Sequence, residues 1–120
     1  MSIATNIAIL IVALLHIAFL VLEMFFWDTK LGLRILGHSR EKAAITKTLA
    51  ANQGLYNGFL AAGLLWGLFL GTEGFATTLF FLCCIIMAGL FGALTVNKII
   101  FYIQALPAIL ALLLLILANP

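Results

Sequence analysis

Charged residues are scarce in this chain. Only 8% of its 120 residues are charged and 66% are hydrophobic, whereas a soluble domain is about a quarter charged and about half apolar. A soluble fold of this size would leave many apolar side chains on its surface, and lipid is the solvent that suits such a surface. The composition therefore excludes a soluble globular domain and a disordered chain, and it predicts an integral membrane protein.

Residues that carry hydrolytic, redox or metal chemistry are also sparse. The serines are Ser2 and Ser39, which leaves no convincing nucleophile for a serine triad. Cys83 and Cys84 are neighbours in an apolar segment, where a thiol behaves as a small hydrophobic side chain, and no zinc-binding spacing occurs. No glycine-rich phosphate loop stands between a strand and a helix. We therefore assign no catalytic residue and expect no cofactor, no metal and no nucleic-acid partner.

Long hydrophobic runs, in contrast, fill the chain. A helix needs about 20 apolar residues to cross the hydrocarbon core of a bilayer, and four segments reach that length. They cover about 3–27, 49–70, 77–96 and 99–118. Only residues 28–48 form a sizeable polar loop. These lengths predict an all-α integral membrane four-helix bundle, with residues 1–120 as a single transmembrane domain.

Local signals refine the ends of these helices. Ser39 is a suitable N-cap for a helix that begins at Arg40 and continues into the second span. Between the last two spans only Asn97 and Lys98 interrupt the apolar sequence. One helix over both spans would measure about 64 Å, roughly twice the hydrocarbon thickness, so we expect a tight hairpin near Asn97. Pro107 lacks a backbone donor and is expected to disturb the fourth helix.

The basic residues predict the orientation in the membrane, because short cytosolic loops are rich in Lys and Arg. All but one of the basic residues lie in the loop 28–48, and the last one, Lys98, lies in a turn on the same side. With four spans, both termini are then outside the cytosol. We expect the loop to lie along lipid headgroups, each basic side chain contributing about 1 kcal/mol near an anionic surface. The predicted headgroup-binding residues are Lys30, Arg34, Arg40, Lys42 and Lys47.

Polar side chains within the spans are costly and often functional. Glu23 and His16 are seven residues apart and lie on one helical stripe. The predicted cytosolic boundaries of the spans are Asp28, Lys47 and Lys98. Counted from them at about 1.5 Å per residue, Glu23, residues 52 and 53, and Gln104 all lie about 7.5–9 Å deep. On the second span these residues fall within one arc of about 140°. The predicted ligand-binding residues are Glu23, His16, Asn52, Gln53, Tyr56, Asn57 and Gln104.

Three classes of function agree with this pattern. In the first, the protein binds or transports a small or lipid-like molecule in a polar intramembrane pocket. In the second, it is a non-catalytic structural or interaction protein whose amides only join helices, a common role of amides in membranes. In the third, Glu23 and His16 act as acid and base on an apolar substrate.

Small residues spaced four apart allow membrane helices to approach closely. The second span carries two such series, one through Gly54 and Gly58 and the other through Gly63 and Gly67. Each can pack helices within one bundle or between subunits. We favour a homodimer in contact with membrane lipids, with a small molecule as the expected ligand.

Several segments together resemble a known family. They are residues 22–25, 52–60, 88–93 and 104–108, and the most specific is Asn-Gln-Gly-x-Tyr-Asn-Gly at 52–58. The sequence resembles the small bacterial membrane proteins grouped as domain of unknown function 1304, over nearly its whole length. The resemblance implies a four-span protein of the bacterial inner membrane, and it supplies no activity.

Overall fold

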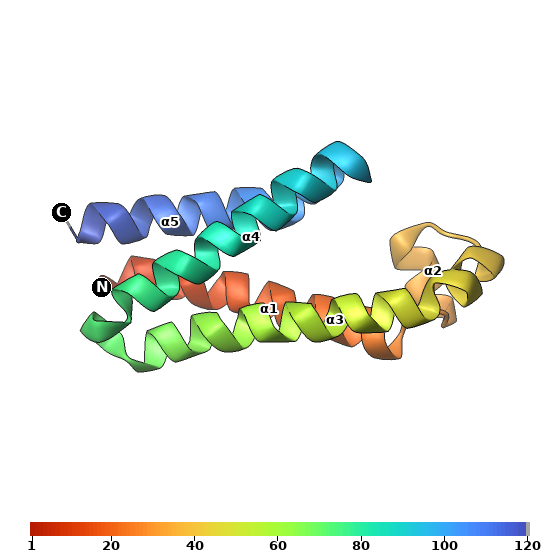
Figure 1. The fold of residues 1–120 in the computed structure, drawn as a ribbon, viewed down its shortest axis with the longest axis horizontal. Helices are drawn as coiled ribbons and strands as arrows, with labels where there is room; N and C mark the ends of the chain where they lie inside the picture. Colours follow the sequence, from red (N-terminus) through yellow and green to blue (C-terminus); the bar gives the residue numbers. More distant parts are fainter. Residues whose placement is uncertain (120) are drawn as a thin grey trace. The chain divides into compact units, whose positions relative to one another are not determined.

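The computed structural model describes residues 1–119, and within them it contains helices and no strand (Figure 1). The predicted all-α class is confirmed. In chain order the α-helices and the short 3₁₀ (η1) and π (η2) segments are α1 Ile3–Phe25, α2 Lys30–Leu36, α3 Arg40–Phe69, η1 Gly71–Gly74, α4 Phe75–Thr95, η2 Phe101–Ala105 and α5 Leu106–Ala118.

The chain divides into two compact units. Unit 1 comprises residues 1–14 and the chain from Leu60 onward, and unit 2 comprises Leu15–Phe59. Both boundaries fall within helices, so α1 and α3 each contribute to both units.

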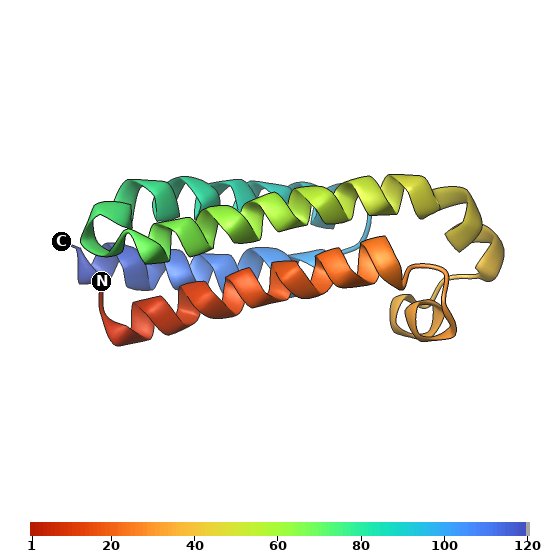
Figure 2. The same ribbon diagram turned by 90° about the horizontal axis from the view of Figure 1, so that it is seen from below.

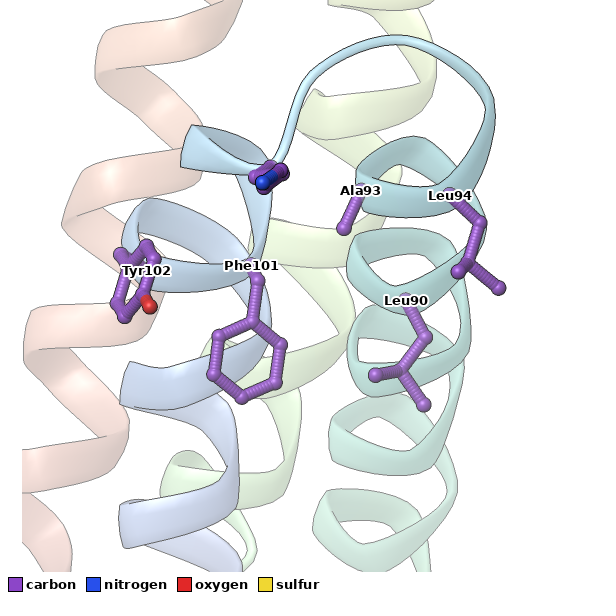
Figure 3. A pocket seen from close by; sticks show the side chains of 6 residues that line it. Leu90, Ala93, Leu94, Phe101 and Tyr102 are labelled. Atoms are coloured by element: carbon purple, nitrogen blue, oxygen red, sulfur yellow. The ribbon is translucent and has the colours of Figure 1, made fainter.

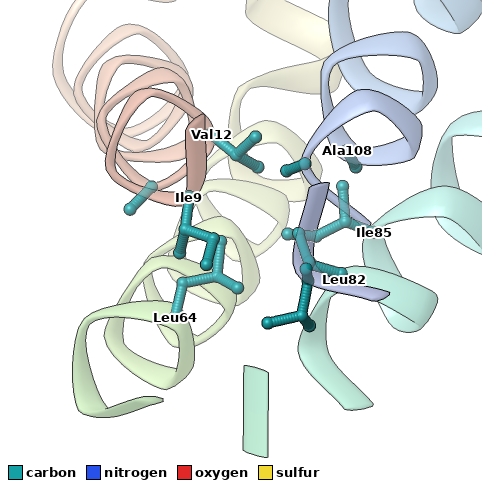
Figure 4. Close-up of a cluster of buried hydrophobic side chains, with 9 residues drawn as sticks. Ile9, Val12, Leu64, Leu82, Ile85 and Ala108 are labelled. Atoms are coloured by element: carbon teal, nitrogen blue, oxygen red, sulfur yellow. The ribbon is translucent and has the colours of Figure 1, made fainter. Parts of the chain in front are cut away.

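Unit 1 has an apolar core to which four helices contribute (Figure 4). Its fully buried members are Ile9, Val12, Ala13, Leu64, Leu82, Ile85, Ala108, Ala111 and Leu115. Small residues bring the helix backbones close together, since a Cβ placed on Gly89 of α4 would lie 2.6 Å from the backbone nitrogen of Ala105. One polar contact joins α1 to α5, where the Thr5 hydroxyl donates to the Leu114 carbonyl at 3.2 Å.

The chain reverses between α4 and η2, close to the predicted hairpin at Asn97. The backbone N–H groups of Val96 and Asn97 both donate to the Gly92 carbonyl, which closes the end of α4. The side chain of Asn97 then accepts from the N–H of Ile99 at 3.0 Å and starts the next helical segment. Helices α4 and α5 consequently run antiparallel within unit 1 (Figure 1).

The disturbance expected at Pro107 takes the form of a π-helical turn. Segment η2 ends immediately before Leu106, whose N–H donates to the Phe101 carbonyl, five residues earlier. A π turn of this kind shifts the hydrogen-bond register by one residue, and such turns are frequent at functional sites. Pro107 then occupies the first turn of α5, where its missing donor costs little.

Unit 2 contains the end of α1, the short helix α2 and the start of α3 (Figure 2). The predicted loop is wrong for Lys30–Leu36, which form α2, although the two ends of this helix carry clear signals. The Thr29 side chain caps α2 by accepting from the N–H of Gly32 at 3.2 Å, and Gly37 ends it with φ 65°. The predicted cap of α3 is confirmed, because the Ser39 hydroxyl accepts from the N–H of Lys42 at 3.1 Å.

Three helical stretches are long and apolar enough to cross a membrane: Ile3–Phe25, Gly71–Thr95 and Phe101–Ala118. Helix α3, which contains the second predicted span 49–70, is not among them. The polar residues at 52, 53, 56 and 57 lower the mean hydropathy of α3, and the first turns of this helix carry charged residues. The second span therefore stays a prediction.

Candidate functional site

The structure brings one acid of the apolar helix α1 and one amide of α3 into direct contact. Glu23 lies near the end of α1 and Asn57 in the middle of α3, 34 residues later. The amide nitrogen Nδ2 of Asn57 donates to Oε1 of Glu23 at 2.5 Å. Asn57 is only 4% exposed, and Glu23 is partly buried. These two residues form the centre of the candidate site.

Small residues on α3 explain why the two side chains meet. A Cβ on Gly54 would lie 2.7 Å from Cγ of Met24, and a Cβ on Gly58 would lie 2.6 Å from Cδ1 of Leu20. Helix α1 therefore packs directly on the two glycines that flank Asn57. Because the helices approach so closely, the short Asn57 side chain reaches the carboxylate of Glu23.

The carbonyl oxygen of the Asn57 side chain is the most unusual atom of the site. Oδ1 is buried and, within residues 1–119, has no hydrogen-bond partner. Leaving such a buried acceptor without a donor costs about 1–3 kcal/mol. The site thus presents two kinds of oxygen, a carboxylate and an amide carbonyl, and the second lacks a donor.

His16 and Gln104 lie on different elements. His16 is fully buried, seven residues before Glu23 on α1, and its ring packs edge-on against Phe19 with centroids 5.2 Å apart. Gln104 is partly buried and belongs to the π turn η2 in unit 1. Their predicted membership in the ligand site stays a prediction.

The other three predicted residues of the second span lie on exposed parts of α3. Asn52 and Gln53 are exposed, and Tyr56 is 50% exposed with its ring against Phe59. At about 100° per residue, Asn57 lies about 60° from Gly54 around the helix, whereas Asn52 lies about 160° away. Asn57 therefore lies at the edge of the predicted polar arc that is next to the glycines, and this edge faces α1.

The polar end of unit 2 is held by several side-chain contacts. Lys47 forms an ion pair with Asp28 at 3.0 Å. The hydrogen bond from Lys47, assisted by its charge, holds the pKa of the Asp28 carboxyl below its ordinary value. The indole of Trp27 donates to Thr46 at 3.0 Å, and Nε2 of His38 donates to the Trp27 carbonyl at 3.2 Å. The segment joining α1 to α3 is therefore anchored at both ends.

The remaining predicted headgroup-binding residues are exposed. They are Lys30 and Arg34 on α2 and Arg40 and Lys42 at the start of α3. Lys30, Arg34 and Lys42 form no ion pair with any residue that the structure describes. No group of three potential metal ligands occurs in the same part of the chain.

Comparisons with known proteins agree with the resemblance seen in the sequence. The family described as protein of unknown function, DUF1304, matches residues 10–116. The uncharacterized protein YpaA of Lactococcus lactis subsp. lactis (strain IL1403) is 36% identical over 114 residues, which cover 93% of this chain and 96% of that protein. No solved structure matches the chain. A match over most of the sequence and a relative of nearly equal length lead to one conclusion: the chain belongs to the DUF1304 family.

Proposed function

We propose that this protein is a four-span protein of the bacterial inner membrane with both termini outside the cytosol. Three span-length apolar helices support the proposal, with α3 as the remaining span. The side on which Lys and Arg gather supports the orientation. Exposed basic residues on α2 and at the start of α3 would then lie against anionic headgroups.

We further propose that the Glu23–Asn57 pair binds a small or lipid-like molecule. One observation carries this proposal: a buried amide oxygen without a donor lies beside a carboxylate on two helices that meet within the apolar part of the chain. A molecule that offers an N–H or O–H group would satisfy Asn57 Oδ1 and contact the carboxylate of Glu23. Amines and hydroxylated lipid-like molecules have this chemistry.

Residues around the pair suit such a ligand. Leu20 and Met24 pack on the glycines of α3, remain partly exposed, and give the pair apolar neighbours. Ligand pockets combine mostly apolar walls with a few precisely placed polar groups. A shift of α1 along the glycine face of α3 would change the access of a ligand to the pair. Such a movement is the simplest way in which a binding site here would serve transport.

The test is to identify what copurifies with the gently extracted protein by mass spectrometry. We expect a molecule with an amine or hydroxyl group to be retained by the wild type and lost from Glu23→Gln, which keeps the size of the side chain. Asn52→Leu is the matched control, because it removes an exposed amide from the same helix. Equal retention by wild type and Glu23→Gln would refute the binding proposal.

The second candidate is a structural or interaction role. It is favoured by the hydrogen bond between Asn57 and Glu23, which directly joins α1 to α3. In that case Glu23→Gln lowers thermal stability, and no specific molecule is retained by any variant. The predicted homodimer is compatible with either candidate, and the oligomeric mass of the extracted protein tests it.

A further inference from the structure

A groove opens between the end of α4 and the π turn η2, both in unit 1. Its volume is about 370 Å³, within the range of small-molecule sites. Leu90, Ala93 and Leu94 line it from α4, and Phe101 and Tyr102 line it from η2 (Figure 3). Lys98, in the turn between the two elements, completes the lining.

The walls of this groove are apolar, and its charged group lies at one end. Leu94 is 87% exposed and Tyr102 is 61% exposed, so both side chains present their surface outward. The ring of Tyr102 is braced edge-on against Phe101 with centroids 5.3 Å apart. Lys98 is exposed and forms no ion pair with any part of the chain that the structure describes. An uncompensated ammonium group therefore stands next to an apolar surface.

The π turn and the glycines of α4 shape the groove. Phe101 and Tyr102 belong to η2, whose shifted register changes the direction of its side chains relative to a regular helix. On α4, a Cβ at Gly92 would lie 2.9 Å from Cγ2 of Ile100, so the side chain just before η2 packs on α4 beside the groove. This contact holds the start of η2 against α4.

The position of Lys98 defines the level of the site in the membrane. It lies in the turn between two stretches that are each long enough to cross a bilayer, Gly71–Thr95 and Phe101–Ala118. That turn belongs at the membrane–water boundary, where phosphate groups lie and where Tyr and Trp side chains are enriched. An amphipathic ligand would place its anionic group at Lys98 and its chain along α4 and η2.

We propose that this groove is a binding site for an anionic phospholipid of the leaflet nearest Lys98. Lys98 and the Tyr102 hydroxyl hold the phosphate, and Leu90, Leu94 and Phe101 cover part of one acyl chain. Charge complementarity favours this occupant over a second copy of the chain, because a two-fold contact through this face would bring the two Lys98 side chains together. The site is separate from the Glu23–Asn57 pair and goes beyond the function proposed for it.

The test is a lipid titration of the detergent-solubilised protein followed by native mass spectrometry, with phosphatidylglycerol and phosphatidylcholine as the two lipids. We expect tighter binding of phosphatidylglycerol. A basic residue near an anionic group contributes about 1 kcal/mol, so Lys98→Gln should weaken phosphatidylglycerol binding about fivefold. The control for net charge is the double variant Lys98→Gln/Glu73→Gln, which also removes an exposed carboxylate in η1 and restores the wild-type net charge; it should bind as weakly as Lys98→Gln alone.

A second pair of variants tests the apolar wall without changing charge. Ala93→Leu fills the groove and should weaken phosphatidylglycerol binding at least fivefold, whereas Ala88→Leu, an exposed position on the same helix, should leave it unchanged. Helix content measured by circular dichroism verifies that all four variants are folded.

Three results would overturn the proposal. Recovery of wild-type binding by Lys98→Gln/Glu73→Gln would mean that only the net charge matters. Unchanged binding by Ala93→Leu, or full competition by glycerol phosphate, would mean that the groove takes no acyl chain. A change in the proportion of dimer with Ala93→Leu, without a change in lipid binding, would identify a second copy as the occupant.

Discussion

Different kinds of interaction stabilise the interior of unit 1 and the interior of unit 2. Unit 1 packs apolar side chains and small residues, and the hydroxyl of Thr5 joins α1 to α5 by a hydrogen bond. Unit 2 carries five of the six basic residues, three of the four acidic residues and both histidines. Its helical segments are joined by the Glu23–Asn57, Trp27–Thr46 and Asp28–Lys47 contacts.

This difference follows from the physics of helix association in lipid. Burial of apolar surface gives little driving force there, since lipid tails are as apolar as the side chains, so helices associate through close packing and through hydrogen bonds. Unit 1 depends mainly on close packing, whereas unit 2 adds several polar contacts to the close packing at Gly54 and Gly58. Unit 1 should therefore be sensitive to changes in volume, and unit 2 to the loss of polar atoms.

The largest effect should come from adding volume to unit 1 at Gly89. A Cβ at this position would lie 2.6 Å from the nitrogen and 2.9 Å from Cα of Ala105, so rigid backbone would have to move. We expect Gly89→Leu to lower the free energy of unfolding by about 3 kcal/mol, at the upper end of overpacking effects. Denaturation in mixed micelles measures it. Ala88→Leu, exposed on the same helix, is the control, and equal effects of the two would contradict the packing argument.

The next largest effect should come from removing the amide of Asn57 in unit 2. Asn57→Leu takes away the donor to Glu23 and leaves the carboxylate partly buried, which should cost about 1–2 kcal/mol in the same denaturation measurement. Asn52→Leu removes an exposed amide and should stay within about 0.5 kcal/mol. If Asn52→Leu proved the more costly variant, the arrangement of α3 against α1 would be wrong.

The contrast between Asn57 and Asn52 shows what the sequence could and could not predict of the site. Helical periodicity placed both residues on one polar arc, because it gives angles around a single helix. Which edge of the arc meets a neighbour depends on where that neighbour packs. Gly54 and Gly58 decide this by allowing close approach. Their spacing in the sequence predicts close packing but does not identify Asn57 as the polar residue beside it.

Depths counted along the helices did not identify this contact for a related reason. Asp28 and Lys47, the two boundaries from which the depths were counted, form an ion pair. Counted from these boundaries, Glu23 is level with residues 52 and 53, whereas the partner of Glu23 is Asn57. Helix α1 ends at Phe25 and the chain turns before Asp28, so the helical rise does not apply between them.

The fold was predicted best where length alone limits the possibilities. The reversal near Asn97 follows from the impossibility of one helix through both apolar segments, and the structure confirms it. Helix α2 was missed because its seven residues mix basic and apolar side chains, and composition outweighed the capping signals of Thr29 and Gly37.

A smaller effect should distinguish two buried threonines of unit 1. The hydroxyl of Thr78 is buried and has no partner within residues 1–119, whereas that of Thr5 donates to the Leu114 carbonyl. Thr78→Val should therefore be neutral or slightly stabilising, and Thr5→Val should cost about 0.5–1 kcal/mol. Equal costs, measured by thermal unfolding, would show that the hydroxyl of Thr78 finds a partner in the membrane.

The smallest effect concerns the ion pair at the polar end of unit 2. The pKa of Asp28 lies below its ordinary value of 3.8 in the folded protein because of the hydrogen bond from Lys47. The folded state is therefore favoured above that ordinary value, and this contribution is lost as the pH falls through the lowered pKa. The melting temperature of the wild type should fall more steeply below pH 4 than that of Asp28→Asn.

Glu41→Gln, which removes an exposed carboxylate from α3, is the control and should keep the wild-type profile. Added salt should reduce the difference, since it screens exposed charges, and identical acid profiles for wild type and Asp28→Asn would show that this ion pair does not stabilise the fold.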